Sequence, residues 1–278
     1  MQWVEISMQW VEISGQRVEI GGRQTGAARQ RLECVRLPSS HARSGAPSIV
    51  FLHEGLGSVS MWRDFPQRVA DATGCEAVVY SRQGYGRSDP LTAPRSVRYL
   101  HDEALIVLPA LLERLRIERP ILLGHSDGAS IALIYAASVP RALNGLIALA
   151  PHVMVEDISV ASIAQARVAY ETTDMRRRLS RHHADADSVF WSWNRIWLDP
   201  AFREWNIESC LPHILCPILA MQGEDDEYGS MEQIERIARQ ARDVDVVKLA
   251  DCRHSPHKDQ PDAALAAIET FVRRLLDE

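Results

Sequence analysis

The sequence lacks a long apolar run. No stretch approaches the roughly 18 residues that a membrane span requires, and the N-terminus has no basic segment followed by an extended apolar one. Cysteine is scarce as well: the chain has five, an odd number, and they are scattered too widely for a disulfide framework or a zinc cluster. These absences predict a cytoplasmic protein with neither a membrane span nor a secretion signal.

Basic charge is also in short supply. The chain has 31 Lys and Arg against 37 Asp and Glu, which gives a formal net charge of −6. This balance predicts no binding to nucleic acid or to an anionic membrane. We expect a small-molecule substrate as the partner, and a homodimer remains open. No Walker-type phosphate loop or dinucleotide-binding fingerprint is found, so no metal, nucleotide or organic cofactor is expected.

The chain nevertheless has the material for a large core, since 46% of its 278 residues are hydrophobic.

Residues 1–14 consist of two tandem copies of the heptapeptide MQWVEIS. One duplication of this length is too short for a solenoid repeat. We interpret residues 1–14 as an N-terminal extension and exclude the first copy from the expected fold.

Short apolar runs rich in β-branched residues alternate with longer segments of helical period. This pattern is typical of an α/β protein with a mostly parallel central sheet, here of about eight strands, and helices on both faces. Strands are expected at residues 48–53, 76–80, 120–124, 145–149, 217–221 and 245–249. Helices are expected near residues 60–72, 97–115, 126–138, 231–241 and 261–276. Two alternating stretches, 17–20 and 31–37, predict an antiparallel hairpin at the sheet edge.

One interval interrupts the alternation. Roughly 65 residues separate the strand that ends near Ala150 from the strand that starts at Pro217, which is far longer than an ordinary crossover. The interval contains helical stretches and four of the seven tryptophans. We therefore predict an inserted helical cap at 152–214 between two parts of one core domain, 15–151 and 215–278.

The segment ILLGHSDGAS, residues 121–130, combines an expected strand, a serine between two glycines, and the start of an expected helix. Such a tight turn holds the serine in a strained conformation and requires small flanking residues, here Gly124 and Gly128. A helix-capping role would explain Ser126 but not both glycines. The pattern therefore favours Ser126 as a nucleophile.

A serine nucleophile needs a base and an acid that orients the base. His254 follows the last expected strand, in ADCRHSPH, and is preferred over His257, which we expect at the surface or behind the base. Four consecutive carboxylates, 224–227, follow the strand at 217–221. Most of such a run is expected to be solvated, and the residues alone leave Asp225 and Asp226 as candidates for the acid.

The segments GHSDG, GEDD and RHSPH, together with SRQGYGRSD at residues 81–89, resemble the α/β-hydrolase family in the chain order nucleophile, acid, histidine. The resemblance covers nearly the whole chain and implies the α/β-hydrolase fold with a cap. It also implies Asp226 as the acid, because the family's acid stands three residues after a glycine. The family's glycine before the histidine is replaced by Arg253, which puts the geometry of that loop in question.

The resemblance further implies an oxyanion hole made of two backbone amides, those of Gly55 in HEGLGS and of Asp127. Glu54 stands where relatives have glycine. It either binds substrate or a cap residue, or pairs with a nearby arginine. Asp127 is also unusual, and its side chain has no role that the sequence indicates.

The implied reaction is acyl transfer to water by a serine hydrolase of the carboxylesterase type. The expected substrate is a small or medium ester, thioester or lactone with an apolar or aromatic acyl part. The alternatives are C–C bond hydrolysis of an aromatic ring-fission product and a non-catalytic ligand receptor on the same fold. Six candidates for the substrate pocket come from the strand ends and the cap: Glu54, His152, Val153, Trp191, Trp193 and Trp197.

Overall fold

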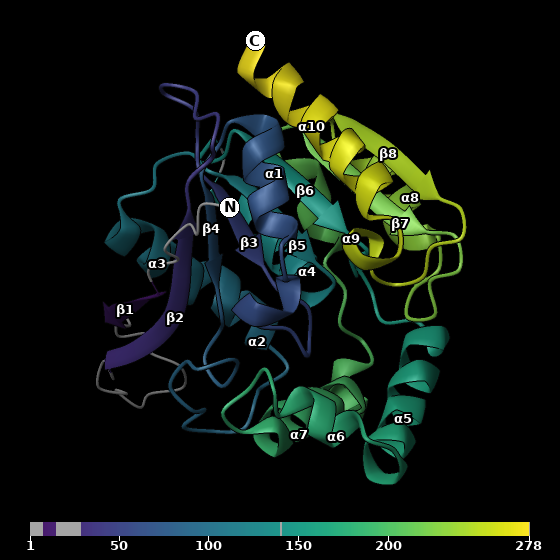
Figure 1. Ribbon diagram of the computed structural model, residues 1–278. Coiled ribbons are helices and arrows are strands. Elements are labelled where there is room, and N and C mark those ends of the chain that lie inside the picture. The colour runs from purple at the N-terminus through teal and green to yellow at the C-terminus, as the bar shows by residue number, and fades with distance from the viewer. Residues whose placement is uncertain (1–7, 15–28, 140, 278) are drawn as a thin grey trace, which may run out of the picture.

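The computed structural model describes residues 8–14, 29–139 and 141–277 (Figure 1). Its centre is an eight-stranded sheet with the strand order β1-β2-β4-β3-β5-β6-β7-β8. The strands are β1 (Met8–Ser14), β2 (Arg29–Leu37), β3 (Ile49–Leu52), β4 (Ala77–Tyr80), β5 (Ile121–His125), β6 (Gly145–Leu149), β7 (Ile218–Gly223) and β8 (Val244–Leu249). The pairs β1/β2 and β2/β4 are antiparallel, and all the others are parallel.

The apolar runs form strands because both faces of the sheet are covered. In β3, Ile49 and Phe51 belong to one hydrophobic core, whereas Val50 and Leu52 belong to a second core on the opposite face. Successive side chains of a strand point to opposite faces, so a strand buried on both sides needs an unbroken apolar run rather than alternation.

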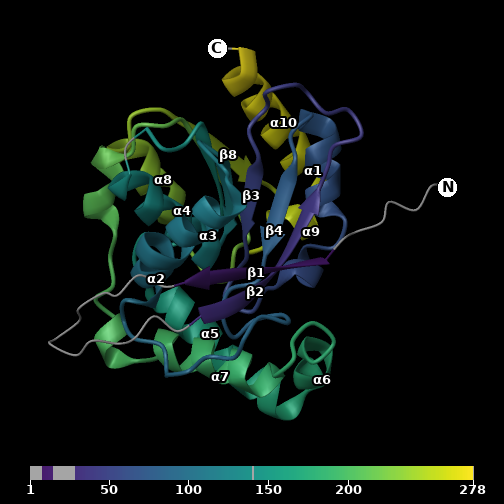
Figure 2. The same ribbon diagram turned by 90° about the vertical axis from the view of Figure 1, so that its left-hand side faces the viewer.

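Two layers of helices flank the sheet (Figure 2). One layer contains η1 (Val59–Trp62), α1 (Phe65–Thr73), α9 (Pro256–Asp259) and α10 (Pro261–Asp277). The other contains α2 (Tyr99–Asp102), the π-helical turn η2 (Glu103–Val107), α3 (Leu108–Leu115), α4 (Asp127–Ser138) and α8 (Glu232–Gln240). None of the helices in the described segments is both long and apolar enough to cross a membrane.

The edge hairpin differs from the expected one. Its second strand is β2, close to the expected 31–37, but the partner is β1, with Met8 opposite Val35 and Ser14 opposite Arg29. The stretch expected as the first strand, 17–20, lies outside the described residues. The second heptapeptide copy thus extends the sheet. It contains Trp10, Val11 and Ile13, and aromatic and β-branched residues of this kind favour a strand.

The interval between β6 and β7 contains α5 (Asp157–Thr172), α6 (Met175–Leu179), α7 (Ala186–Trp197), η3 (Pro200–Phe202) and η4 (Glu208–His213). In Figure 1, α5, α6 and α7 lie together below the sheet, apart from the two flanking layers. Three aromatic side chains of this interval are buried in the larger core: Phe190, Phe202 and Trp205. The rings of Phe202 and Trp205 also stack on each other. The inserted segment therefore covers the carboxyl edge of the parallel strands.

Candidate active site

Ser126 lies at a sharp turn between β5 and α4. Its φ of 54° and ψ of −118° are values that a residue with a Cβ adopts only under strain. The glycines around it are required sterically, because a Cβ on Gly124 would overlap the backbone of Gly128, and a Cβ on Gly128 would overlap the carbonyl oxygen of Leu52. The turn therefore lifts the hydroxyl above the sheet edge at the start of a helix.

Three loops at this edge bring Ser126, His254 and Asp226 into one hydrogen-bonded chain. The Oγ of Ser126 lies 3.0 Å from Nε2 of His254, and Nδ1 of the same ring lies 2.8 and 2.9 Å from the two carboxylate oxygens of Asp226. The loops follow β5, β8 and β7, respectively. Such a chain can pass the hydroxyl proton to the imidazole while the carboxylate stabilises the resulting cation.

Asp226, and not Asp225, is the carboxylate that faces the ring. Asp226 is buried and accepts hydrogen bonds from the amides of Tyr228, at 2.8 Å, and Gly229, at 3.3 Å, whereas Asp225 is exposed. Burial acts to raise the pKa of Asp226, but the adjacent His254 and the donated hydrogen bonds outweigh it and lower that pKa. The carboxylate is therefore held in its ionised form.

The cation of Arg253 does not intrude on the histidine loop. Its Nη2 lies 3.1 Å from a carboxylate oxygen of Glu227, and the side chain is largely exposed. Of the two positions expected for His257, the surface is wrong: His257 is buried, with its ring centroid 4.7 Å from that of Trp62 and 4.9 Å from that of His125. The ring of His125 in turn lies 5.2 Å from that of His254, so His257 lies behind the base. The helical turn that starts at Pro256 directs His257 into the core, where it packs against aromatic rings.

A cavity of about 170 Å³ opens onto Ser126 and His254. Four of the six candidate pocket residues line it: Glu54, His152, Trp193 and Trp197. Sequence reasoning missed Leu56, Ile163 and Tyr228, which also line it. Tyr228 could have been found from its position two residues after Asp226, whereas Leu56 and Ile163 carry no signal that separates them from other core residues.

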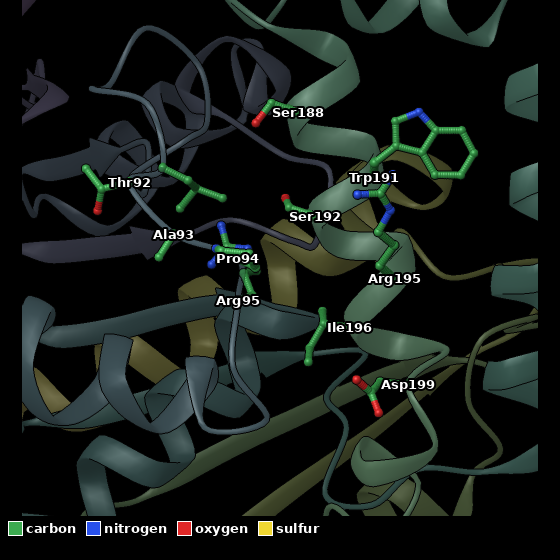
Figure 3. A pocket seen from close by; sticks show the side chains of 11 residues that line it. Thr92, Ala93, Pro94, Arg95, Ser188, Trp191, Ser192, Arg195, Ile196 and Asp199 are labelled. Carbon is green, nitrogen blue, oxygen red and sulfur yellow. The ribbon is translucent and has the colours of Figure 1, made fainter. Parts of the chain in front are cut away.

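The other two candidates do not reach this cavity. Val153 is wholly buried in the core, and its amide donates to Oε1 of Gln233 at 2.7 Å. Trp191 lies on the far side of α7 and borders a separate cavity of about 500 Å³ between α7 and the loop at 91–95 (Figure 3). The reason is helical period: Trp193 and Trp197, four residues apart, share the face towards Ser126, and Trp191 does not lie on that face.

Glu54 forms an ion pair, one of the alternatives that the sequence left open, and it also lies at the cavity. Its carboxylate lines the cavity and also lies 3.3 Å from Nζ of Lys258 and 3.5 Å from Nδ1 of His125. Burial acts to raise the pKa of Glu54, but Lys258 and His125 overcome it and hold that pKa well below its usual range. The pairing partner is thus a lysine from α9 rather than an arginine.

The two amides expected at an oxyanion hole lie near the hydroxyl. Gly55 lines the same cavity as Ser126, and Asp127 is the first residue of α4. Amides in the first turn of a helix have no acceptor within that helix, so the Asp127 N–H is available to an anion beside Ser126.

Several buried histidines lie around the site or in the inserted segment between β6 and β7. Burial lowers the pKa of both His152 and His183 to about 4. His183 accepts a hydrogen bond from the amide of Gly86 at 2.9 Å, and its other ring nitrogen lies 3.0 Å from the carbonyl oxygen of Leu56. The unfolded chain protonates such a histidine near pH 6.5, so the folded state loses stability as the pH falls from about 6.5 towards about 4.

We therefore expect His183→Gln to weaken the pH dependence of unfolding. Glutamine keeps one donor and one acceptor but cannot be protonated, so about 2 kcal/mol of the loss of unfolding free energy between pH 7.5 and pH 4.5 should disappear. Urea denaturation at the two pH values measures this. The exposed His41→Gln serves as the control and should retain the wild-type difference; an unchanged difference in His183→Gln would contradict the prediction.

A profile of the Alpha/beta hydrolase family matches residues 49–268. Among characterised relatives, the sn-1-specific diacylglycerol lipase ABHD11 of Danio rerio is 23% identical over 257 residues, which cover 81% of this chain and 78% of that protein. A 2-hydroxy-6-oxononadienedioate/2-hydroxy-6-oxononatrienedioate hydrolase of Pseudomonas putida is 32% identical over 105 residues, but these cover only 37% of this chain and 36% of the relative.

Solved structures of similar fold include a thermophilic esterase from Thermogutta terrifontis, with a TM-score of 0.70, 17% identity and coverage of 96% of this chain and 99% of that one. The enol-lactonase from Burkholderia xenovorans LB400 has a TM-score of 0.68 and 18% identity. The match covers 90% of this chain and 97% of the lactonase chain. These likenesses confirm the fold expected from the sequence. Because the family profile matches most of the chain, the chain belongs to the α/β-hydrolase family.

Proposed function

We propose that this hydrolase cleaves a small ester, thioester or lactone with an apolar or aromatic acyl part, through an acyl-enzyme on Ser126. The observation that carries the proposal is the continuous hydrogen-bonded chain from Ser126 through His254 to the ionised Asp226. A hydroxyl used only to cap a helix would need neither of the other two groups, and Ser126 makes no side-chain capping bond to α4.

In the proposed reaction, His254 removes the proton of Ser126 as the Oγ attacks the substrate carbonyl, and the amides of Gly55 and Asp127 stabilise the oxyanion. The imidazolium then returns its proton to the leaving group. Water enters, His254 deprotonates it, and the same steps release the acid and restore Ser126. Asp226 holds the imidazole tautomer and stays ionised throughout.

The cavity supports a small, apolar acyl part. At about 170 Å³ it is smaller than the cavities of several hundred Å³ that take drug-sized ligands. The indoles of Trp193 and Trp197 and the side chain of Ile163 supply apolar surface around the hydroxyl. We infer that short acyl chains and small aromatic acyl groups are preferred over long ones.

C–C bond hydrolysis of a ring-fission product is the second candidate, because three relatives, 29–32% identical over 105–115 residues, are named as 2-hydroxy-6-oxononadienedioate/2-hydroxy-6-oxononatrienedioate hydrolases. Such a substrate is a dicarboxylate, and its recognition calls for cationic side chains. No lysine or arginine is found among the described residues that line the Ser126 cavity, and Glu54 adds negative charge there. The cavity therefore favours the ester class.

A fluorophosphonate probe and a p-nitrophenyl ester series test the proposal. We expect labelling at Ser126, located by peptide mass spectrometry, and a kcat/KM that falls as the acyl chain grows from acetate to octanoate. Lactones, thioesters and a ring-fission dienedioate assayed alongside separate the two hydrolytic candidates. A wild-type protein that is neither labelled nor active, but whose melting temperature rises with a small ligand, would instead be a receptor.

A further inference from the structure

Asp127 has a buried carboxylate whose contacts come from three parts of the chain. The hydroxyl of Tyr99 in α2 donates to Oδ2 at 2.9 Å, and the indole N–H of Trp197 in α7 donates to Oδ1 at 3.2 Å. Nη1 of Arg82, in the loop after β4, lies 3.6 Å from Oδ2. The side chains of Arg82 and Asp127 are 0% and 1% exposed, so two opposite charges compensate one another where water does not reach them.

Arg82 also contacts the segment after β3, which contains Glu54. Its Nη2 donates to the carbonyl oxygen of Glu54 at 2.9 Å, and its backbone amide donates to Nε2 of His53 at 3.0 Å. Nδ1 of His53 lies 2.7 Å from the same carbonyl oxygen. Since Nε2 accepts, Nδ1 carries the proton and donates, so the Glu54 carbonyl is held by two donors.

That carbonyl belongs to the peptide unit whose N–H is the amide of Gly55. The peptide unit is planar and trans, so its C=O and N–H point in opposite directions. Fixing the carbonyl oxygen on Arg82 and His53 therefore fixes the direction of the Gly55 N–H. One guanidinium thus touches both segments that supply the amides beside Ser126: the Glu54–Gly55 peptide and residue Asp127.

We propose that Arg82 and Asp127 are positioning residues that hold both oxyanion-hole amides in place, with Trp197 connecting this pair to the cap. The inference rests on the proposed function, because it assigns a purpose to the oxyanion hole of that reaction. Trp197 lies in α7 and also lines the substrate cavity. Its indole N–H ties it to the residue that follows Ser126.

The main test is the double variant Arg82→Gln/Asp127→Asn, which removes both charges so that neither is left buried and unpaired. We expect kcat for a p-nitrophenyl ester to fall about 10²-fold with KM changed less than about threefold, because the lost stabilisation is confined to the transition state. Affinity for a boronic acid, a mimic of the tetrahedral intermediate, should fall by a similar factor. The matched control Arg36→Gln/Glu76→Gln removes a paired arginine and carboxylate near the opposite edge of the sheet and should keep wild-type values.

Tyr99→Phe provides a milder second test should the double variant fail to fold. It deletes only the hydroxyl that binds Asp127, and Tyr99 is not among the residues lining the Ser126 cavity. We expect a loss of about three- to tenfold in both kcat and boronic acid affinity. The control Tyr170→Phe deletes a hydroxyl bonded to Asp187 within the cap and should change neither.

The possible outcomes separate the two proposals. If the wild type is active and labelled at Ser126, but the folded double variant and Tyr99→Phe keep kcat and boronic acid affinity within about twofold of wild type, the positioning role is wrong and the proposed function stands. Equal losses in Tyr99→Phe and Tyr170→Phe would also overturn it. A wild type without activity or label removes the proposed function itself.

Discussion

Ser126→Ala is expected to lower kcat for p-nitrophenyl ester hydrolysis by about 10³-fold or more, with the fold intact. The substitution removes the atom that would form the acyl-enzyme, and the oxyanion amides alone supply only the residual acceleration over water. Alanine has the same Cβ as serine, so it accepts the φ of 54° at the same cost in strain. Steady-state kinetics and loss of the fluorophosphonate label measure the effect.

A matched control for this variant lies on the same helix. Ser138, at the end of α4, bonds its hydroxyl to the carbonyl oxygen of Ile134 at 2.8 Å and lies about three turns from the site. Ser138→Ala should keep wild-type kcat and labelling, with both variants melting within a few degrees of wild type. Retention of more than about a tenth of the activity in Ser126→Ala would overturn the assignment of the nucleophile.

Asp226→Asn is expected to lower kcat by about 10³- to 10⁴-fold, a magnitude known for the equivalent change in a serine protease. In the wild type, both carboxylate oxygens of Asp226 face Nδ1 of His254, at 2.8 and 2.9 Å. This contact requires the ring proton to lie on Nδ1. An amide would present its NH₂ group to the ring, favouring the tautomer with the proton on Nε2. That nitrogen faces Ser126 and could then no longer accept the hydroxyl proton.

Asp225→Asn is the matched control, since it makes the same chemical change at the neighbouring residue. Asp225 is exposed and has no contact with His254, so kcat should stay within about threefold of wild type. Raising the pH should not rescue Asp226→Asn, because the wrong tautomer is neutral. A larger loss in Asp225→Asn than in Asp226→Asn would reverse the choice of acid.

Local pattern was sufficient for much of the fold. The unbroken apolar runs at β3, β5, β6 and β7 lie within one or two residues of the expected strands, because a strand covered on both faces leaves that trace in the sequence. The edge hairpin was not recovered correctly. Residues 8–14 pair with β2, a partner that the sequence pattern did not single out, because residues 17–20, which lie outside the described residues, contain a similar alternating stretch.

The inserted segment between β6 and β7 shows the same limit: its side-chain directions could not be predicted. Tryptophan content and the length of the interval predicted an inserted helical segment, but could not say which indoles face the hydroxyl. Trp193 and Trp197 do and Trp191 does not, because the rotation of α7 about its axis is set by what it packs against. Val153 was placed wrongly for another reason: it follows β6 closely and is near the site in sequence, but its side chain is wholly buried in the core.

By itself, the sequence determined the α/β architecture, the turn around Ser126, and the chain order of Ser126, Asp226 and His254, because each depends on residues close together along the chain or on a short motif. Only the tertiary structure shows what the Asp127 side chain contacts. Its partners Arg82, Tyr99 and Trp197 lie far from it in sequence, the last of them 70 residues away. A buried charge takes its partners from whatever elements pack around it, and that packing is a property of the folded chain alone.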